Sequence, residues 1–177
     1  MKHPERIELA PGYSISRIIT GLWQVADIEK EDGSMDLGPA ASELVDYAES
    51  GFDTFDMADH YGSAELIAGH ARRKMQENDS ANRPSSQARF HTKWCPKPGE
   101  MTPQKVREGV LLSAERLDME QIDLMQFHWW NYEHPQYLDA MEGLRTLKEE
   151  GIIHHLGLTN FDTDHLHLLL QEGIPII

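Results

Sequence analysis

The sequence has one cysteine, Cys95, among its 177 residues, and it has no long apolar run. A single cysteine excludes a disulfide within the chain, which suits a reducing compartment, so we expect a cytoplasmic location. No apolar stretch approaches the roughly 20 residues that a membrane helix requires. Residues 1–11 also lack the apolar core of a signal peptide. The sequence therefore predicts no membrane partner.

Positive charge is scarce as well. The chain has 16 Lys and Arg residues against 30 Asp and Glu residues, which gives a formal net charge of -14. A protein this acidic repels the phosphate backbone, and no basic run offsets the repulsion, so we expect no nucleic-acid partner. With 40% hydrophobic and 26% charged residues, the composition is typical of a globular protein with a buried core.

The pattern of apolar residues predicts strands that alternate with helices. Two short apolar runs flank the turn pair Pro11-Gly12 and indicate a small hairpin before the main series. Expected strands lie at 18–23, 52–57, 89–94, 122–128 and 154–159, expected helices lie at 37–50, 64–75, 103–117, 136–150 and 164–172, and a sixth strand begins at 174.

Several helix ends carry recognisable signals. Thr102 before Pro103 predicts a helix start, and Gly151 and Gly173 stand where helices are expected to stop. The one long polar connection, 76–88, is expected to be a surface excursion, because the strand and helix rhythm resumes unchanged after it. We therefore expect one domain over residues 1–177.

Alternating strands and helices predict a parallel sheet, for which two architectures are open. A doubly wound dinucleotide-binding sheet requires G-x-G-x-x-G after its first strand, and residues 21–38 (GLWQVADIEKEDGSMDLG) lack it. A TIM (β/α)8-type barrel instead places its chemistry at the carboxyl ends of many strands, and a complete one takes about 250 residues. We expect an incomplete α/β barrel of about five βα units, the start of strand six and an N-terminal hairpin.

Chemically capable side chains follow the expected strands. Asp56, Lys93 and His128 end the second, third and fourth strands, and Tyr61 follows Asp56 by five residues. Each alone has an ordinary structural explanation, such as a helix cap or core packing. Because the carboxyl ends of parallel strands meet at one end of a barrel, the combination indicates a catalytic site.

Four segments in order, FDMADHYGSAE (55–65), FHTKW (90–94), IDLMQFHWW (122–130) and GLTNF (157–161), resemble consecutive motifs of the aldo/keto reductases. The resemblance extends from about residue 13 to the last residue. It implies a (β/α)8 barrel and an oxidoreductase that reduces aldehyde or ketone carbonyls of small molecules. The implied cofactor is NADPH, with NADH as the alternative, and no metal is implied.

The resemblance also assigns catalytic roles to Asp56, Tyr61, Lys93 and His128. Tyr61 would give a proton to the carbonyl oxygen, Lys93 would favour the resulting phenolate, and Asp56 would hold the ammonium. His128 would orient the carbonyl. An Asn side chain offers the donor and the acceptor that a carboxamide requires. The expected cofactor-binding residues are Gly21, Trp23, Asp56, Thr159 and Asn160.

The four tryptophans lie at or just beyond strand ends. Together they would make an apolar, aromatic rim for a flat carbonyl substrate, and Trp23 is the expected substrate contact. The set is Trp23, Trp94, Trp129 and Trp130.

The sequence stops in the expected sixth strand. In the family, later strands and loops supply a glutamine, an aromatic platform and the phosphate-binding segments. We therefore expect a carboxyl-terminally truncated reductase with weak NADPH binding and little turnover. An unclosed barrel exposes two strand edges, so self-association through these edges is also expected.

Other functions remain open. A non-catalytic binding or regulatory module can retain a barrel scaffold. A metal-dependent hydrolase would use some of the ten histidines, although no H-x-H or H-E-x-x-H spacing is present. Lys93 could form a Schiff base. Cys95, between Lys93 and Lys97, could be a redox sensor or simply a small apolar loop residue.

Overall fold

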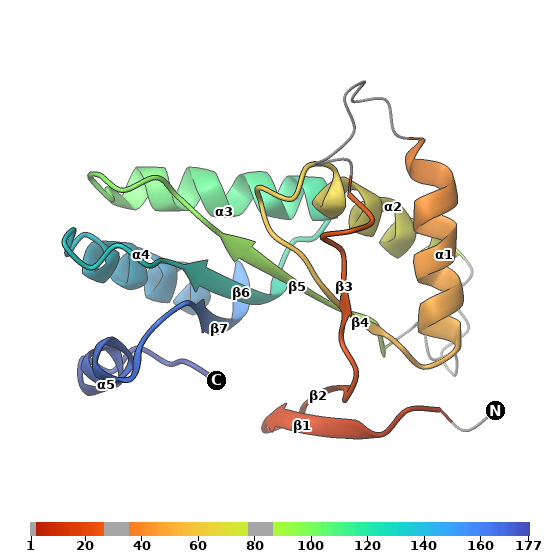
Figure 1. Ribbon diagram of the computed structural model, residues 1–177, viewed down its shortest axis with the longest axis horizontal. Helices are drawn as coiled ribbons and strands as arrows, with labels where there is room; N and C mark the ends of the chain where they lie inside the picture. The colour runs from red at the N-terminus through yellow and green to blue at the C-terminus, as the bar shows by residue number, and fades with distance from the viewer. Residues whose placement is uncertain (1–2, 27–35, 78–86) are drawn as a thin grey trace.

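Five parallel strands form one sheet in the computed structural model, which describes residues 3–26, 36–77 and 87–177 (Figure 1). Each strand lies beside the next one along the chain. Most of the surface excursion expected at 76–88 lies outside the described residues. The strands are β3 (Thr20–Gly21), β4 (Thr54–Asp56), β5 (Arg89–Trp94), β6 (Ile122–His128) and β7 (Ile153–Thr159).

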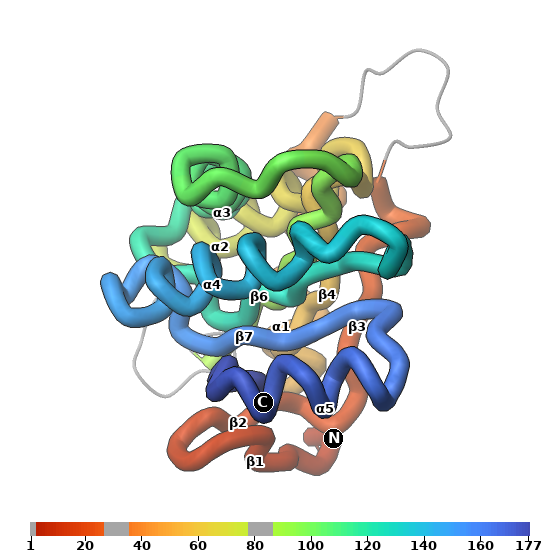
Figure 2. The backbone as a smooth tube through the Cα atoms, turned by 90° about the vertical axis from the view of Figure 1, so that its left-hand side faces the viewer, coloured from red at the N-terminus to blue at the C-terminus, as the bar shows by residue number. Residues whose placement is uncertain are grey.

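A helix follows each strand, and the helices lie on the outside of the sheet (Figures 1 and 2). Parallel neighbours joined through helical crossovers are the repeating unit of an α/β barrel. Among the described residues, no helix has the length and apolar character needed to cross a membrane. The helices are α1 (Leu37–Glu49), α2 (Ala64–Glu77), α3 (Pro103–Leu117), α4 (Tyr137–Glu149) and α5 (Thr163–Gln171).

The predicted helix signals act as expected. The Thr102 hydroxyl accepts a hydrogen bond from the Lys105 backbone N–H at 3.2 Å, and Pro103 begins α3. Gly151 and Gly173 follow α4 and α5 with φ angles of 81° and 76°, a left-handed conformation that glycine adopts without strain. These caps place the helix ends within a residue or two of the predicted ones.

The predicted hairpin, β1 (Arg6–Ala10) and β2 (Tyr13–Ser16), covers the amino ends of the sheet strands. Tyr13 is buried, and its hydroxyl lies 2.9 Å from Nε2 of His91 in β5. The Ser16 backbone N–H donates to the Thr54 hydroxyl at 3.0 Å, at the start of β4. The hairpin therefore closes one end of the sheet, and the carboxyl ends of the strands remain at the other.

A sixth strand begins where the sequence predicts it. Leu156 of β7 forms a parallel bridge with Ile176, and the Ile177 N–H donates to the Leu156 carbonyl at 3.0 Å. The sheet thus continues beyond β7 in the same direction.

Two strand predictions are too long. The strand expected at 18–23 contains only Thr20–Gly21, and the one expected at 52–57 contains only Thr54–Asp56. Ile18 and Ile19 are 58% and 43% exposed, so their apolar character does not reflect burial in the sheet. Among the described residues, β3 pairs with β4 alone, and an edge strand has fewer hydrogen bonds to extend it.

Candidate active site

Lys93 is the centre of a group of polar side chains at the carboxyl end of the sheet. It is only 7% exposed, and its ammonium is ion-paired with the Asp56 carboxylate. The same ammonium donates to the Met57 carbonyl at 2.9 Å and lies 5.0 Å from the centroid of the Tyr61 ring. The structure therefore brings together three of the four predicted catalytic residues.

The loop between β4 and α2 places Tyr61 beside this ammonium. The Asp59 N–H donates to the Lys93 carbonyl at 2.9 Å, which continues the β4–β5 pairing beyond Asp56. The Tyr61 carbonyl accepts from the Ala64 N–H at 2.9 Å, at the first turn of α2. Tyr61 is half-buried as a result and does not extend freely into solvent.

The buried carboxylate of Glu65 stabilises the same loop between β4 and α2. Glu65, 2% exposed in α2, accepts from the Thr92 hydroxyl at 2.6 Å and from the Arg116 guanidinium at 3.2 Å. Arg116 also donates to the Asp59 carbonyl at 3.2 Å. Because a buried charge is tolerated only when it is paired, these contacts fix α2 relative to β5 and α3.

His128 ends β6, and its Nε2 lies 2.7 Å from the side-chain nitrogen of Asn160. Burial, and then the electrostatic interactions with His60 and Lys93, lower the pKa of His128 below its ordinary value. The imidazole is therefore neutral at pH 7. Its Nδ1 is buried and has no hydrogen-bond partner within the described residues.

Gln126 is a site residue that sequence reasoning missed. Its amide donates to Asp56 Oδ1 at 2.8 Å, and its carbonyl oxygen accepts from the Thr159 hydroxyl at 3.1 Å. It therefore links the Asp56–Lys93 ion pair to the end of β7. A signal was present, because Gln126 precedes His128 by two residues in a strand and so faces the same side of the sheet.

The expected cofactor-binding residues surround this group. Asn160 is exposed and adopts a left-handed backbone conformation with φ of 64°, directly after Thr159 at the end of β7. Gly21 pairs with Asp56 in the sheet, and the exposed Trp23 ring stands perpendicular to the Tyr61 ring with centroids 4.7 Å apart. An exposed amide beside a hydroxyl has the donors and acceptors that a nicotinamide carboxamide requires, so these residues fit that group.

The predicted rim of four tryptophans is wrong in two positions. Trp94 and Trp129 are 5% and 2% exposed and pack in the core against Phe127. Trp23 and Trp130 are exposed, and Trp130 contacts His128 with ring centroids 4.8 Å apart. Of the four tryptophans, only Trp23 and Trp130 are exposed.

Cys95 does not have the electrostatic environment of a reactive thiolate. Burial, and then the charge of Asp59, raise the pKa of the Cys95 thiol to about 11. The thiol is protonated at neutral pH, which contradicts the interpretation that nearby lysines favour a thiolate redox sensor.

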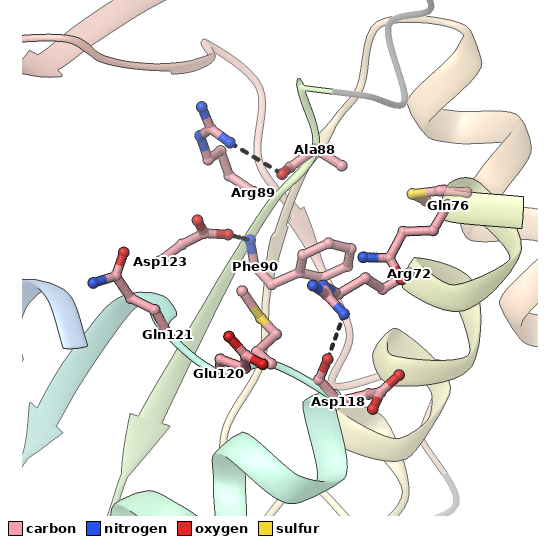
Figure 3. A pocket seen from close by; sticks show the side chains of 11 residues that line it. Arg72, Gln76, Ala88, Arg89, Phe90, Asp118, Glu120, Gln121 and Asp123 are labelled. Atoms are coloured by element: carbon pink, nitrogen blue, oxygen red, sulfur yellow. Dashed lines mark hydrogen bonds between the residues drawn. The ribbon is translucent and has the colours of Figure 1, made fainter. Parts of the chain in front are cut away.

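A large cavity of about 600 Å³ lies at the opposite end of the sheet (Figure 3). Figure 3 shows Arg72 donating to the Asp118 carbonyl and Asp123 accepting from the Phe90 N–H, the latter at 2.9 Å. Neither Lys93 nor His128 lines this cavity. In α/β barrels this amino-terminal end contributes to stability and not to catalysis, so the candidate site is the group around Lys93.

Comparisons with known proteins agree with this arrangement. The model of the aldo/keto reductase family matches residues 17–177. The methylglyoxal reductase DkgA of Escherichia coli is 28% identical over 100% of this chain and 58% of its own length. An NADH-specific methylglyoxal reductase of Escherichia coli is 26% identical over 90% of this chain and 53% of its own. The chain thus spans about half the length of these curated relatives.

Solved structures show the same fold. The aldo-keto reductase AKR2E4 of Bombyx mori, crystallised in complex with NADP, superposes with a TM-score of 0.74 at 18% identity, over 97% of this chain and 55% of the other. The predicted incomplete (β/α)8 barrel is therefore confirmed. With the match of residues 17–177 to the family model, the chain belongs to the aldo/keto reductase family.

Proposed function

We propose that this protein is an oxidoreductase that reduces aldehyde or ketone carbonyls with hydride from NADPH, and that Tyr61 donates the proton. One observation carries the proposal: the Lys93 ammonium is ion-paired with the Asp56 carboxylate and lies 5.0 Å from the centroid of the Tyr61 ring. A buried cation beside a phenol is the arrangement that stabilises a phenolate after proton transfer.

The proton step follows from the charges. When hydride adds to the carbonyl carbon, the C–O π electrons move to oxygen and create an oxyanion. The Tyr61 hydroxyl transfers its proton to that oxygen, which gives an alcohol and leaves a phenolate. Lys93 stabilises the phenolate, and Asp56 keeps the ammonium in position. Neutral His128 hydrogen bonds to the carbonyl oxygen and orients it.

The described residues include the proposed contacts to the nicotinamide end of the cofactor. Thr159 and Asn160 would hold the carboxamide, and Gly21, Trp23 and Asp56 would border the nicotinamide. When bound, the nicotinamide supplies the hydride. A related solved structure contains NADP and one curated relative is NADH-specific, so NADPH is the proposed cofactor and NADH the alternative.

A small carbonyl compound suits the exposed aromatic side chains. The Trp23 ring contacts Tyr61, and the Trp130 ring contacts His128. Two flat rings favour a small, planar substrate. Since the curated relatives named above reduce methylglyoxal according to their names, methylglyoxal is the first substrate to test.

The test is a titration of the chain with NADPH that follows tryptophan fluorescence, together with NADPH oxidation in the presence of methylglyoxal. We expect saturable quenching, because Trp23 is one of the proposed cofactor contacts, and slow turnover that a chelator does not reduce. Asn160→Ala should weaken quenching, whereas Gln104→Ala, on the exposed surface of α3, should not. Absence of both quenching and turnover from folded protein would contradict the proposal.

A further inference from the structure

We propose that His60, Cys95 and His128 form a binding site for a borderline divalent metal ion, with Zn²⁺ as the probe. One ring nitrogen of each histidine and the sulfur of Cys95 all lie within 4.8 Å of one another. The ion would occupy the position beside His128 that the carbonyl substrate uses. Sequence spacing does not indicate such a site, because His60, Cys95 and His128 form neither an H-x-H nor an H-E-x-x-H motif.

The separations are close to those of a bound zinc ion. Tetrahedral coordination with Zn–N near 2.0 Å and Zn–S near 2.3 Å places ligand atoms about 3.3–3.6 Å apart. The imidazole rings of His60 and His128 already lie with centroids 5.7 Å apart. His60 is exposed, so a small rotation of its side chain can bring its ligand nitrogen to such a separation while Nδ1 keeps its contact with Asp59.

Asp59 orients two of the three ligands. Its Oδ1 lies 2.9 Å from Nδ1 of His60, and its Oδ2 accepts from the Cys95 N–H at 3.0 Å. Metal-binding histidines commonly donate their second ring N–H to a carboxylate in this way, which fixes the tautomer and leaves Nε2 for the metal. Among the described residues, this carboxylate joins the loops that carry His60 and Cys95.

His128 is the third proposed metal ligand, and one of its ring nitrogens has no hydrogen bond. Its Nδ1 is buried without a hydrogen-bond partner among the described residues, while Nε2 contacts the Asn160 amide. When one ring nitrogen binds metal, the other can donate to the Asn160 amide oxygen, because an amide offers both a donor and an acceptor. With a metal bound, both ring nitrogens of His128 therefore have a bonding partner.

The nitrogen and sulfur ligand atoms determine which metal ions the site favours. Two imidazole nitrogens and one thiolate suit Zn²⁺ or Co²⁺, whereas Mg²⁺ and Ca²⁺ prefer oxygen ligands. On binding, the Cys95 thiol releases its proton to solvent and the sulfur forms the metal bond. Three protein ligands leave a fourth position for water.

The functional consequence rests on the proposed function. A metal on His128 removes the imidazole that orients the carbonyl oxygen, so Zn²⁺ inhibits reduction competitively with the carbonyl substrate. Cys95→Ser removes the inhibition and leaves turnover without zinc unchanged, because Cys95 has no role in the proton or hydride step.

Direct binding is measured without substrate or cofactor, so its outcome is independent of the proposed function. Tag-free protein competes with a chromophoric chelator for Zn²⁺ and is titrated with Co²⁺. We expect one Zn²⁺ per chain, and a near-ultraviolet thiolate-to-cobalt absorption. Cys95→Ser and His60→Gln should each weaken Zn²⁺ binding at least tenfold, and Cys95→Ser should abolish the absorption. His167→Gln, exposed on α5, is the matched control.

Two results would overturn the proposal. One is a wild-type chain that binds Co²⁺ without the thiolate absorption. The other is Zn²⁺ affinity that is equal in the wild type and in folded Cys95→Ser. If binding is confirmed but reduction is never observed, the metal site stands and the proposed function fails.

Discussion

The Lys93 ammonium lies 5.0 Å from the centroid of the Tyr61 ring while it is ion-paired with Asp56. Lys93 is 7% exposed, so water does little to screen its charge. The buried ammonium is therefore close enough to the Tyr61 ring to stabilise a phenolate, and this relationship is the basis of the proposed proton transfer.

Removing the charge tests that relationship. Lys93→Met keeps the length and apolar stem of the side chain but removes the ammonium. We expect kcat for methylglyoxal to fall about 100-fold or more, the range of positioned acid–base groups, because the Tyr61 phenolate loses its stabilising charge. Steady-state kinetics measures the change, and circular dichroism melting confirms folding. A variant that is folded and fully active would show that the ammonium is not needed.

Gln126 is expected to act by positioning. Gln126→Leu removes the bridge between Asp56 and Thr159, so both of these groups lose a hydrogen bond. We expect kcat/KM to fall about tenfold, which corresponds to about 1.4 kcal/mol. Thr159→Val should lower kcat/KM less in the Gln126→Leu background than in the wild type if the three residues act as one network. Simple additivity of the two losses would contradict the network.

Because His91 is buried, we expect the free energy of unfolding to decrease at acidic pH. Burial is the main cause that lowers the pKa of His91 from 6.5 to about 4. Below pH 6.5 the unfolded chain binds a proton at this position that the folded chain does not, so stability falls as the pH drops toward 4. The slope is up to about 1.4 kcal/mol per pH unit for this one group.

Urea unfolding at several pH values measures that slope. His91→Gln can still hydrogen bond to the Tyr13 hydroxyl and should give a shallower slope, while His155, whose pKa is also lowered, adds to the slope in both proteins. His167→Gln, at an exposed position, should leave the slope unchanged. An unaltered slope in His91→Gln would show that this histidine is not the group responsible.

Self-association through the edges of the sheet stays a prediction. Ile18 and Ile19, just before the edge strand β3, are 58% and 43% exposed. Apolar side chains beside an unpaired strand edge favour pairing with another chain. Ile18→Lys should reduce the concentration-dependent increase of mass in sedimentation velocity, whereas Leu111→Lys on α3 should not. A wild-type chain that is monomeric at all concentrations would contradict this expectation.

The sequence predicted the central elements well because their signals are local. Residues 122–128 form a strand with the predicted bounds and are rich in buried apolar residues. Residues 89–94 also form a strand with the predicted bounds, and its apolar residues Phe90 and Trp94 are both buried. The helix at 103–117 also has the predicted bounds, because Thr102 and Pro103 mark its start. Where burial and capping determine an element, periodicity is sufficient to find it.

Contacts between strands could not be predicted in this way. The bridge made by Gln126 and the approach of Cys95 to His60 depend on strand register and loop geometry, which no local pattern encodes. The burial of Trp94 and Trp129 depends on which face of each strand meets the helices. A position at a strand end alone does not distinguish a core tryptophan from an exposed one.

The most direct test of the proposed mechanism is the turnover of Tyr61→Phe, which loses one hydroxyl and keeps the ring beside Lys93. With methylglyoxal and saturating NADPH, we predict that kcat falls at least about 100-fold, since the proton donor is gone, while quenching of tryptophan by NADPH is unchanged. Turnover equal to that of the wild type, from folded Tyr61→Phe protein, would show that another group donates the proton.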